Sequence, residues 1–252
     1  MKPILDWFTE SYFTLPILMI CQFGAALVGY RHRHKFAELK YFHLYPIASL
    51  TQGIFACATV GLLDPNTAWK YSRISIMIFI FLEAILLYNF FSNAIKVNSL
   101  KFILKALFIG FFIFSIAIFV LTNTFLNSEM IITGETCVVI LSVCLYFKQL
   151  FRMPASHEII EEPAFWINIG VLFVFSCTLP AMTLSFFGQG SILSDSYAFI
   201  INFVGYSVLF LFIIRGYLCR KEEVISVRRN FGFNSRMNSR EEAEWQYLEK
   251  EL

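Results

Sequence analysis

Seven apolar stretches separated by short polar connections constrain this chain more than any other feature of its sequence. A hydrocarbon core about 30 Å thick needs roughly twenty helical residues for each crossing. The stretches have about that length and lie at Phe13–Tyr30, Phe42–Leu63, Ile74–Ile95, Phe102–Phe125, Met130–Phe151, Ala164–Phe187 and Ser196–Leu218. We therefore predict an all-α integral membrane protein, a seven-transmembrane-helix bundle over residues 1–218 followed by a tail at 219–252.

The composition supports this class of fold. Apolar residues make up 58% of the chain and charged residues 15%, whereas soluble domains have roughly half and about a quarter. Seven crossings use most of the 252 residues. We therefore expect no soluble catalytic domain within these residues.

Lys and Arg residues are divided unequally between the two sides that these stretches define. Seventeen of the twenty fall in the first, third and fifth connections or at and beyond the end of the last stretch, and only Lys2, Lys70 and Arg73 fall on the other side. Basic segments stay cytoplasmic because their translocation is costly. We predict a multi-pass protein of the cell membrane with its N-terminus outside and its C-terminus in the cytoplasm.

The connections on the outer side are expected to be brief. They are predicted at Asp64–Arg73, Leu126–Glu129 and Gly188–Asp195. None is long enough to form a separate ligand-binding domain. An external ligand would therefore have to be small, or would have to bind among the helix ends.

Glu83 is the sharpest candidate for a functional residue. It lies near the middle of the third stretch, where an ionised carboxylate costs several kcal/mol unless it is paired, protonated or facing a polar interior. Gln52 lies near the middle of the second stretch, and the short connection predicts that these helices are antiparallel neighbours, so we predict that Gln52 is the partner of Glu83. The pair either joins two helices or forms a proton-linked or ligand-sensing group.

Other polar residues of the predicted spans fall at two depths. Asn89 and Asn168 lie toward the cytoplasmic half, and Glu135, Thr178 and Asn202 toward the outer half. Glu135 is close to the membrane surface, where we expect it to be hydrated, since charged groups cost less near the interface. An outer cavity lined by Glu135, Thr178 and Asn202 is a further hypothesis.

Several motifs that would indicate catalysis or a cofactor are missing from the sequence. The interior of the seventh stretch has no Lys for a retinal Schiff base, and His43 is the only histidine near a span, which leaves membrane haem without paired ligands. Ser207 has no intramembrane histidine to act as its base. There is no HExxH motif, CxxC pair or phosphate-binding glycine loop. We expect no enzymatic activity, no cofactor, no metal site and no nucleic-acid partner.

Two segments on the predicted cytoplasmic side have room for contact with a partner. One is the fifth connection, Arg152–Pro163, which contains Glu161 and Glu162, and the other is the tail. Within the tail, Ser239–Glu242 matches a capping box and predicts a short helix over residues 239–252. The residues that would share the apolar face of this helix are Trp245, Leu248 and Leu252. This face either docks on a protein partner or the membrane, or belongs to a solvated tail.

The start of the sixth stretch carries the only sequence resemblance with a specific motif. Glu162-Pro-Ala-Phe-Trp-Ile-Asn-Ile-Gly170 resembles the same region of seven-helix sensor domains, and of stand-alone uncharacterised membrane proteins, that are associated with bacterial histidine kinases. The resemblance implies a sensor in a bacterial membrane. The tail has neither a phosphoacceptor histidine nor an ATP-binding domain, so such a sensor would have to signal through a separate protein.

The sequence leaves three functions open. The first is a receptor-like or regulatory membrane protein that senses a small ligand or membrane state and relays it to a separate partner, such as a histidine kinase. The second is a small transporter or channel subunit with Glu83 as an intramembrane coupling site. The third is a structural subunit of a membrane complex.

Overall fold

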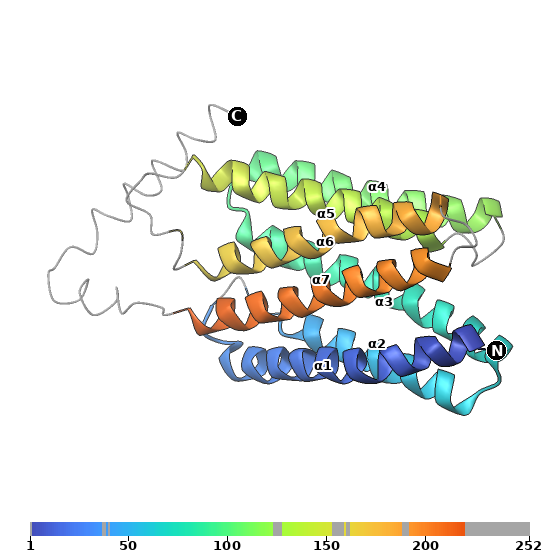
Figure 1. Cartoon of the computed structure of the whole chain (residues 1–252). Coiled ribbons are helices and arrows are strands. Elements are labelled where there is room, and N and C mark those ends of the chain that lie inside the picture. Colours follow the sequence, from blue (N-terminus) through green and yellow to red (C-terminus); the bar gives the residue numbers. More distant parts are fainter. Residues whose placement is uncertain are drawn as a thin grey trace, which may run out of the picture.

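The fold is entirely helical wherever the chain is described. The computed structural model describes residues 2–36, 39, 41–122, 128–152, 159, 162–187 and 192–219. Over these ranges the chain forms seven long helices. They lie side by side in an up-and-down bundle (Figure 1). These helices are α1 (Lys2–His32), α2 (Leu44–Leu62), α3 (Pro65–Ala94), α4 (Asn98–Thr122), α5 (Ser128–Leu150), α6 (Pro163–Phe187) and α7 (Ile192–Leu218).

Six of the helices close into a ring. α1 packs against α2 and α7, α2 against α3, α3 against α5, α5 against α6, and α6 against α7. α4 packs against α3 and α5 and lies at the edge of the bundle (Figure 1). Among the five helices that are long and apolar enough to cross a membrane, α4 has the smallest buried share.

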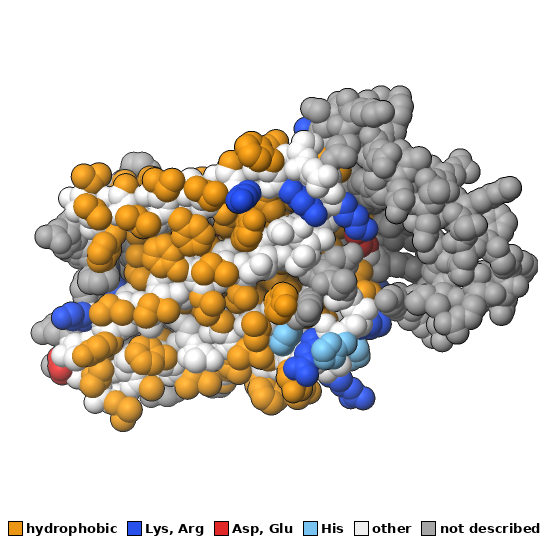
Figure 2. Space-filling model, turned by 180° about the vertical axis from the view of Figure 1, so that it is seen from behind, with side chains coloured by type: hydrophobic (Ala, Val, Ile, Leu, Met, Phe, Trp, Pro, Cys, Tyr) orange, Lys and Arg blue, Asp and Glu red, His pale blue; other side chains and the backbone are white. Residues whose placement is uncertain are grey.

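Five of the seven helices, α3 to α7, are long and apolar enough to cross a membrane. This count of five covers only the part of the chain that the structure describes. The flanks of the bundle expose many large apolar side chains, such as Phe102 at 75% and Leu121 at 83% (Figure 2). An apolar surface of this extent is unfavourable in water and suits a hydrocarbon environment. The chain is therefore a helical membrane protein.

Basic side chains gather at one end of this apolar surface (Figure 2). This end, which we call the basic end, is where α1, α3, α5 and α7 finish and α2, α4 and α6 begin. Within the described ranges it carries nine Lys and Arg residues: Arg31, Arg33, Lys35, Lys96, Lys101, Lys105, Lys148, Arg152 and Arg215. Lys2, Lys70 and Arg73 lie toward the other end, near the starts of α1 and α3.

The segment predicted as an outer connection, Asp64–Arg73, is helical from Pro65 onward, so α3 begins nine residues before the predicted span. The Asp64 carboxylate accepts a hydrogen bond from the Thr67 backbone N–H at 3.1 Å, and Pro65 occupies the first helical turn. Aspartate at the N-cap followed by proline is a strong helix-start signal. Hydropathy missed it, since the first turns of α3 are polar. Leu63 and Asp64 alone connect α2 to α3.

Every other helix except α2 also begins before its predicted position, and the shift is largest in α1. α1 begins at Lys2 rather than Phe13, and α7 begins at Ile192 rather than Ser196. In both cases polar residues extend the helix beyond its apolar part. A hydropathy pattern reports the membrane-embedded portion of a helix and not its full length.

The most extensive helix contact, between α6 and α7, depends on glycines. A Cβ atom at Gly170 would lie 2.9 Å from the Phe212 Cβ and 3.3 Å from the Leu209 Cα, and one at Gly216 would lie 3.0 Å from the Pro163 carbonyl oxygen. Small residues of this kind allow helix backbones in a membrane to approach closely. α6 and α7 therefore form a tightly joined pair.

Side chains at the basic end hold adjacent elements together. The Gln149 side chain near the end of α5 accepts hydrogen bonds from the Lys96 N–H at 2.7 Å and the Val97 N–H at 3.2 Å. Its amide donates to the Ala94 carbonyl at 3.3 Å. The Lys35 ammonium donates to the Cys219 carbonyl beyond α7. Backbone groups left unpaired at helix ends are satisfied in this way.

We expect Gly170→Ala to lower stability by about 1–3 kcal/mol, because the added methyl group meets Phe212 and the backbone of α7. The measurement is the midpoint of thermal unfolding in detergent. Gly61→Ala is the matched control, since no described atom lies within 4 Å of the position that its added methyl group would take. At Gly61 the same substitution should be neutral or stabilising by up to about 1 kcal/mol. Equal midpoints for the two variants would contradict the close contact between α6 and α7.

Candidate functional site

Glu83 is buried in the bundle and is satisfied by a tyrosine. Its side chain is only 2% exposed, and its Oε1 atom accepts a hydrogen bond from the Tyr45 hydroxyl at 2.7 Å. Tyr45 is the second residue of α2 and is fully buried. A hydrogen bond to an ionised carboxylate is among the strong ones. This bond joins the start of α2 to the interior of α3.

The prediction that Gln52 is the partner of Glu83 is wrong, and the helix register explains why. In antiparallel helices joined by a tight turn, residues equally distant from the turn lie at the same level. Tyr45 and Glu83 are each nineteen residues from Asp64, whereas Gln52 is only twelve residues away. Gln52 is therefore two helical turns, roughly 10 Å, from the level of Glu83.

Gln52 instead lines a separate groove between α2 and α3. This groove has a volume of about 390 Å³ and includes the polar side chains of Thr51 and Ser75. Its remaining lining residues are Ala48, Phe55, Ile78, Phe79 and Leu82. Glu83 is not part of it.

Glu135 is buried, so the expectation that it is hydrated near the surface is also wrong. Its side chain is 3% exposed, and its Oε1 atom has no hydrogen-bond partner among the described residues. Glu135 lies on one face of α5 with the buried residues Ile131, Val139 and Ser142, at spacings of four, four and seven residues. This face points into the bundle. Depth along the helix alone does not determine hydration.

Glu83 and Glu135, both buried, belong to one cluster with two tyrosines, of which Tyr45 is buried and Tyr206 is partly exposed. The Glu83 and Glu135 carboxyl groups interact electrostatically with each other and with the hydroxyls of Tyr45 and Tyr206. Glu83 lies eleven residues before the end of α3, Tyr206 twelve before the end of α7, and Glu135 fifteen before the end of α5. These three helices run in the same direction. At 1.5 Å per residue, the three positions fall within about 6 Å along the bundle axis.

We call these four residues the acid cluster. Its energy depends on how many of its carboxyl groups are ionised. An isolated carboxylate in a low-dielectric interior is costly, and two neighbouring ones repel each other. Two ionised acids at Glu83 and Glu135 would therefore require a cation, whereas a bound proton would neutralise one of them. Binding or release of one proton or one cation at the two acids would therefore change the electrostatic energy of the interior of the bundle.

The remaining candidates do not converge on the acid cluster. Asn202 in α7 accepts a hydrogen bond from the Thr178 hydroxyl of α6 at 3.3 Å, so these two members of the predicted outer set do meet. Neither is hydrogen-bonded to Glu135 in the described structure. Asn89 donates to the Ile85 carbonyl of its own helix at 3.0 Å.

Asn168 is fully buried near the start of α6. Its amide donates to the Ala164 carbonyl at 2.7 Å, and its Oδ1 atom has no partner among the described residues. It lies five residues from the start of α6 and is thus closer to the basic end than Glu83 is. The residue bears on the packing of α6 and not on the acid cluster.

Glu162 is the only predicted partner-docking residue within the described part of the chain. Its Oε2 atom accepts a hydrogen bond from the buried Tyr146 hydroxyl of α5 at 3.1 Å. The contact attaches the segment before α6 to α5. The other docking candidates, Glu161, Trp245, Leu248 and Leu252, lie outside the described residues.

The motif that suggested a kinase-associated sensor has a packing role in this structure. Trp166 stacks on Phe212 with ring centroids 5.9 Å apart, and the Arg215 guanidinium lies 5.3 Å from the centroid of the same Trp166 ring. Gly170 of this motif is the close contact between α6 and α7 described above. The motif therefore explains how α6 is held against α7.

Sequence reasoning missed Tyr45 and Tyr206 as members of the acid cluster. Residue counts along the helices would have placed both at the level of Glu83. Tyr45 is as far from the turn at Asp64 as Glu83 is, and Tyr206 is about as far from the basic end of α7 as Glu83 is from that end of α3.

Comparison with known proteins adds no relative: no family model, curated protein or solved structure matches this chain.

We expect a double-mutant cycle between Tyr45→Phe and Glu83→Gln to give a coupling of about 0.5–3 kcal/mol, as residues in direct contact do. Tyr45→Phe alone should be destabilising, because the Glu83 carboxyl group loses its donor while remaining buried. Unfolding of the purified protein in mixed micelles measures both quantities. The control cycle pairs Gln52→Leu with Glu83→Gln and should be additive. The assignment fails if Gln52, and not Tyr45, is the residue that couples to Glu83.

Proposed function

We propose that this chain is a receptor-like or regulatory protein of the cell membrane with seven crossings, its N-terminus outside and its basic end in the cytoplasm. A small ligand, ion or membrane state changes the acid cluster, and the cytoplasmic connections transmit the change to a separate partner such as a histidine kinase. The observation that carries this proposal is the hydrogen bond from Tyr45 to the buried Glu83.

The position of Tyr45 supports a relay toward the basic end. Tyr45 follows Leu44, the first residue of α2, and so lies next to the connection that links α1 to α2. A change in the charge or occupancy of Glu83 alters the acceptor that holds Tyr45. A stimulus has this effect only if it binds one arrangement of the helices better than the other.

A second link runs from the acid cluster through α5. Glu135 lies eleven residues, three helical turns, before Tyr146 on the inward face of α5. The Tyr146 hydroxyl donates to Glu162 in the segment that precedes α6. A shift of α5 would therefore be felt in the fifth connection, where we expect a partner to bind.

A second candidate function, an ion-coupled transporter or channel subunit, is favoured by Glu135 itself. Its carboxyl oxygen, which has no partner among the described residues, lies in the same cluster as Glu83. Intramembrane acids commonly carry protons or mark ion pathways. Exchange of a proton or cation between the two acids would supply a coupling step.

Hydrogen exchange of the full-length protein in lipid nanodiscs tests the relay. We expect Glu83→Gln to increase amide exchange about two- to tenfold at residues 41–45 and at the end of α5, since weaker packing lowers the free energy of local opening. The control is Asn89→Ala, which alters a polar residue on the same helix that donates to a carbonyl of that helix. A change confined to the immediate neighbours of residue 83 would contradict a relay.

Proton flux in liposomes separates the two candidate functions. Flux in the wild type that is lost in both Glu83→Gln and Glu135→Gln would establish transport. The receptor would be supported by two results together. Glu83→Gln would change amide hydrogen exchange far from residue 83 without any proton flux in the wild type, and the fifth connection would cross-link to a co-expressed kinase.

A further inference from the structure

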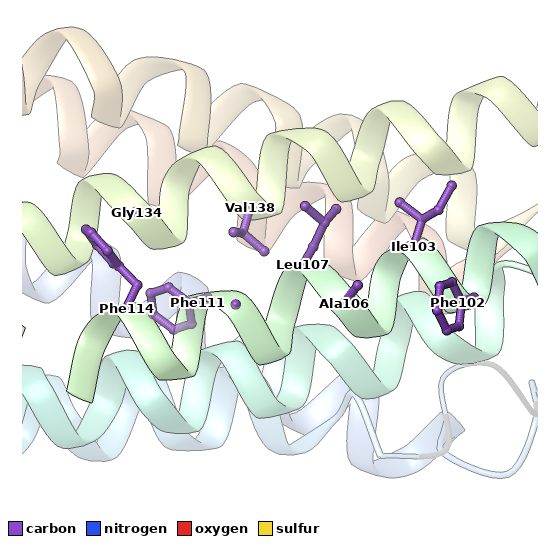
Figure 3. A pocket seen from close by; sticks show the side chains of 9 residues that line it. Phe102, Ile103, Ala106, Leu107, Phe111, Phe114, Gly134 and Val138 are labelled. Carbon is purple, nitrogen blue, oxygen red and sulfur yellow. The ribbon is translucent and has the colours of Figure 1, made fainter. Parts of the chain in front are cut away.

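An apolar groove runs between α4 and α5 on the flank of the bundle (Figure 3). Its volume is about 560 Å³, and it is separate from the acid cluster. Phe102 and Phe114 lie toward its two ends and are both exposed. No charged or polar side chain of the described residues lines it, since the other lining residues are Ile103, Ala106, Leu107, Gly110, Phe111, Gly134 and Val138.

Small residues create this hollow. Gly110 has no described atom within 4 Å of the place where a Cβ would lie, and Ala106 adds only a methyl group one turn away. On α5, Gly134 lets the Phe114 ring approach to 2.8 Å from a would-be Cβ. The groove follows α4 for twelve residues, from Phe102 to Phe114. That distance is roughly 18 Å, longer than one leaflet of the hydrocarbon core.

Basic residues stand at the end of the groove nearest the basic end. Lys148 follows Gly134 by fourteen residues, close to four whole helical turns, so it shares the same face of α5, and Arg152 follows one turn later, just beyond the helix. The contact between Phe114 and Gly134 sets the antiparallel register and places Lys148 level with about residue 100, just beyond Phe102. Both basic side chains are exposed.

Lys101 and Lys105 provide an internal comparison. They lie at a similar level on α4, but their helical positions turn them away from the groove face defined by Ile103, Ala106 and Gly110. Two pairs of basic residues therefore differ in position. Lys148 and Arg152 are aligned with the groove, whereas Lys101 and Lys105 are not.

We propose that the α4–α5 groove binds an acyl chain of an anionic phospholipid whose headgroup phosphate is held by Lys148 and Arg152. The apolar lining suits a hydrocarbon chain and offers nothing to a polar solute. Arginine pairs well with phosphate, and exposed Lys and Arg near a membrane surface attract anionic lipids. The bound chain fills the space beside α4, the helix at the edge of the bundle. This proposal does not depend on the receptor function.

Native mass spectrometry with added phosphatidylglycerol or phosphatidylcholine tests the headgroup site. We expect the wild type to bind phosphatidylglycerol more tightly, and the double variant Lys148→Gln/Arg152→Gln to lose about tenfold in affinity for it while its affinity for phosphatidylcholine changes little. The matched control, Lys101→Gln/Lys105→Gln, removes the same charge away from the groove and should stay within about twofold of the wild type. Equal losses in the two double variants would overturn the site, because they would indicate nonspecific attraction.

Gly110→Leu tests the hydrocarbon part of the site. The leucine projects into open space, so the helix should tolerate it, but it occupies the groove. We expect one fewer tightly bound phospholipid for this variant, with either headgroup. An unchanged number of bound lipids, with the thermal midpoint of the wild type retained, would overturn the proposal that a chain lies in the groove.

Discussion

The hydrogen bond between Tyr45 and Glu83 joins two helices in the interior of the bundle, where a carboxyl group without a partner is costly. It fixes α2 to α3 at the level that the turn at Asp64 gives them, and α3 in turn packs on α4 and α5. The same need for a partner applies to the buried carboxyl group of Glu135. Its carboxyl group faces the same interior with an oxygen that has no hydrogen-bond partner in the described structure. The centre of the bundle is thus both a structural junction and the place most sensitive to a change of charge.

Around this centre the helices are held in different ways. α6 and α7 meet through glycines, at distances that leave no space for another atom. At the basic end, Gln149 binds the connection between α3 and α4, and Tyr146 binds Glu162 before α6. α4 and α5, by contrast, leave a groove. Close packing resists rearrangement, whereas single polar contacts can exchange partners, so we expect any motion to involve the polar contacts around α5 and the start of α2.

The number and approximate positions of the helices could be predicted because hydropathy reports what lies within the hydrocarbon. Their starts could not. α3 begins at a capping signal, Asp64-Pro65, that lies outside its apolar part. The importance of Glu83 was predictable from its depth, but the identity of its partner depends on the position of the turn at Asp64, which hydropathy alone does not give. Glu135 was predicted to be hydrated because it lies near the membrane surface, but it is buried. Its exposure depends on which face of α5 is turned inward, which depth does not give.

The sequence by itself determined that this protein is helical and apolar, that its basic residues gather at one end of the bundle, and that Glu83 is buried at a depth where an acid is costly. These properties follow from the composition and order of residues along each helix. The tertiary structure decided that Tyr45 satisfies Glu83, that Glu135 and Tyr206 lie in the same cluster, and that Lys148 and Arg152 stand at the mouth of a groove. Those results depend on the rotation and register of neighbouring helices, which arise from packing between segments far apart in the chain.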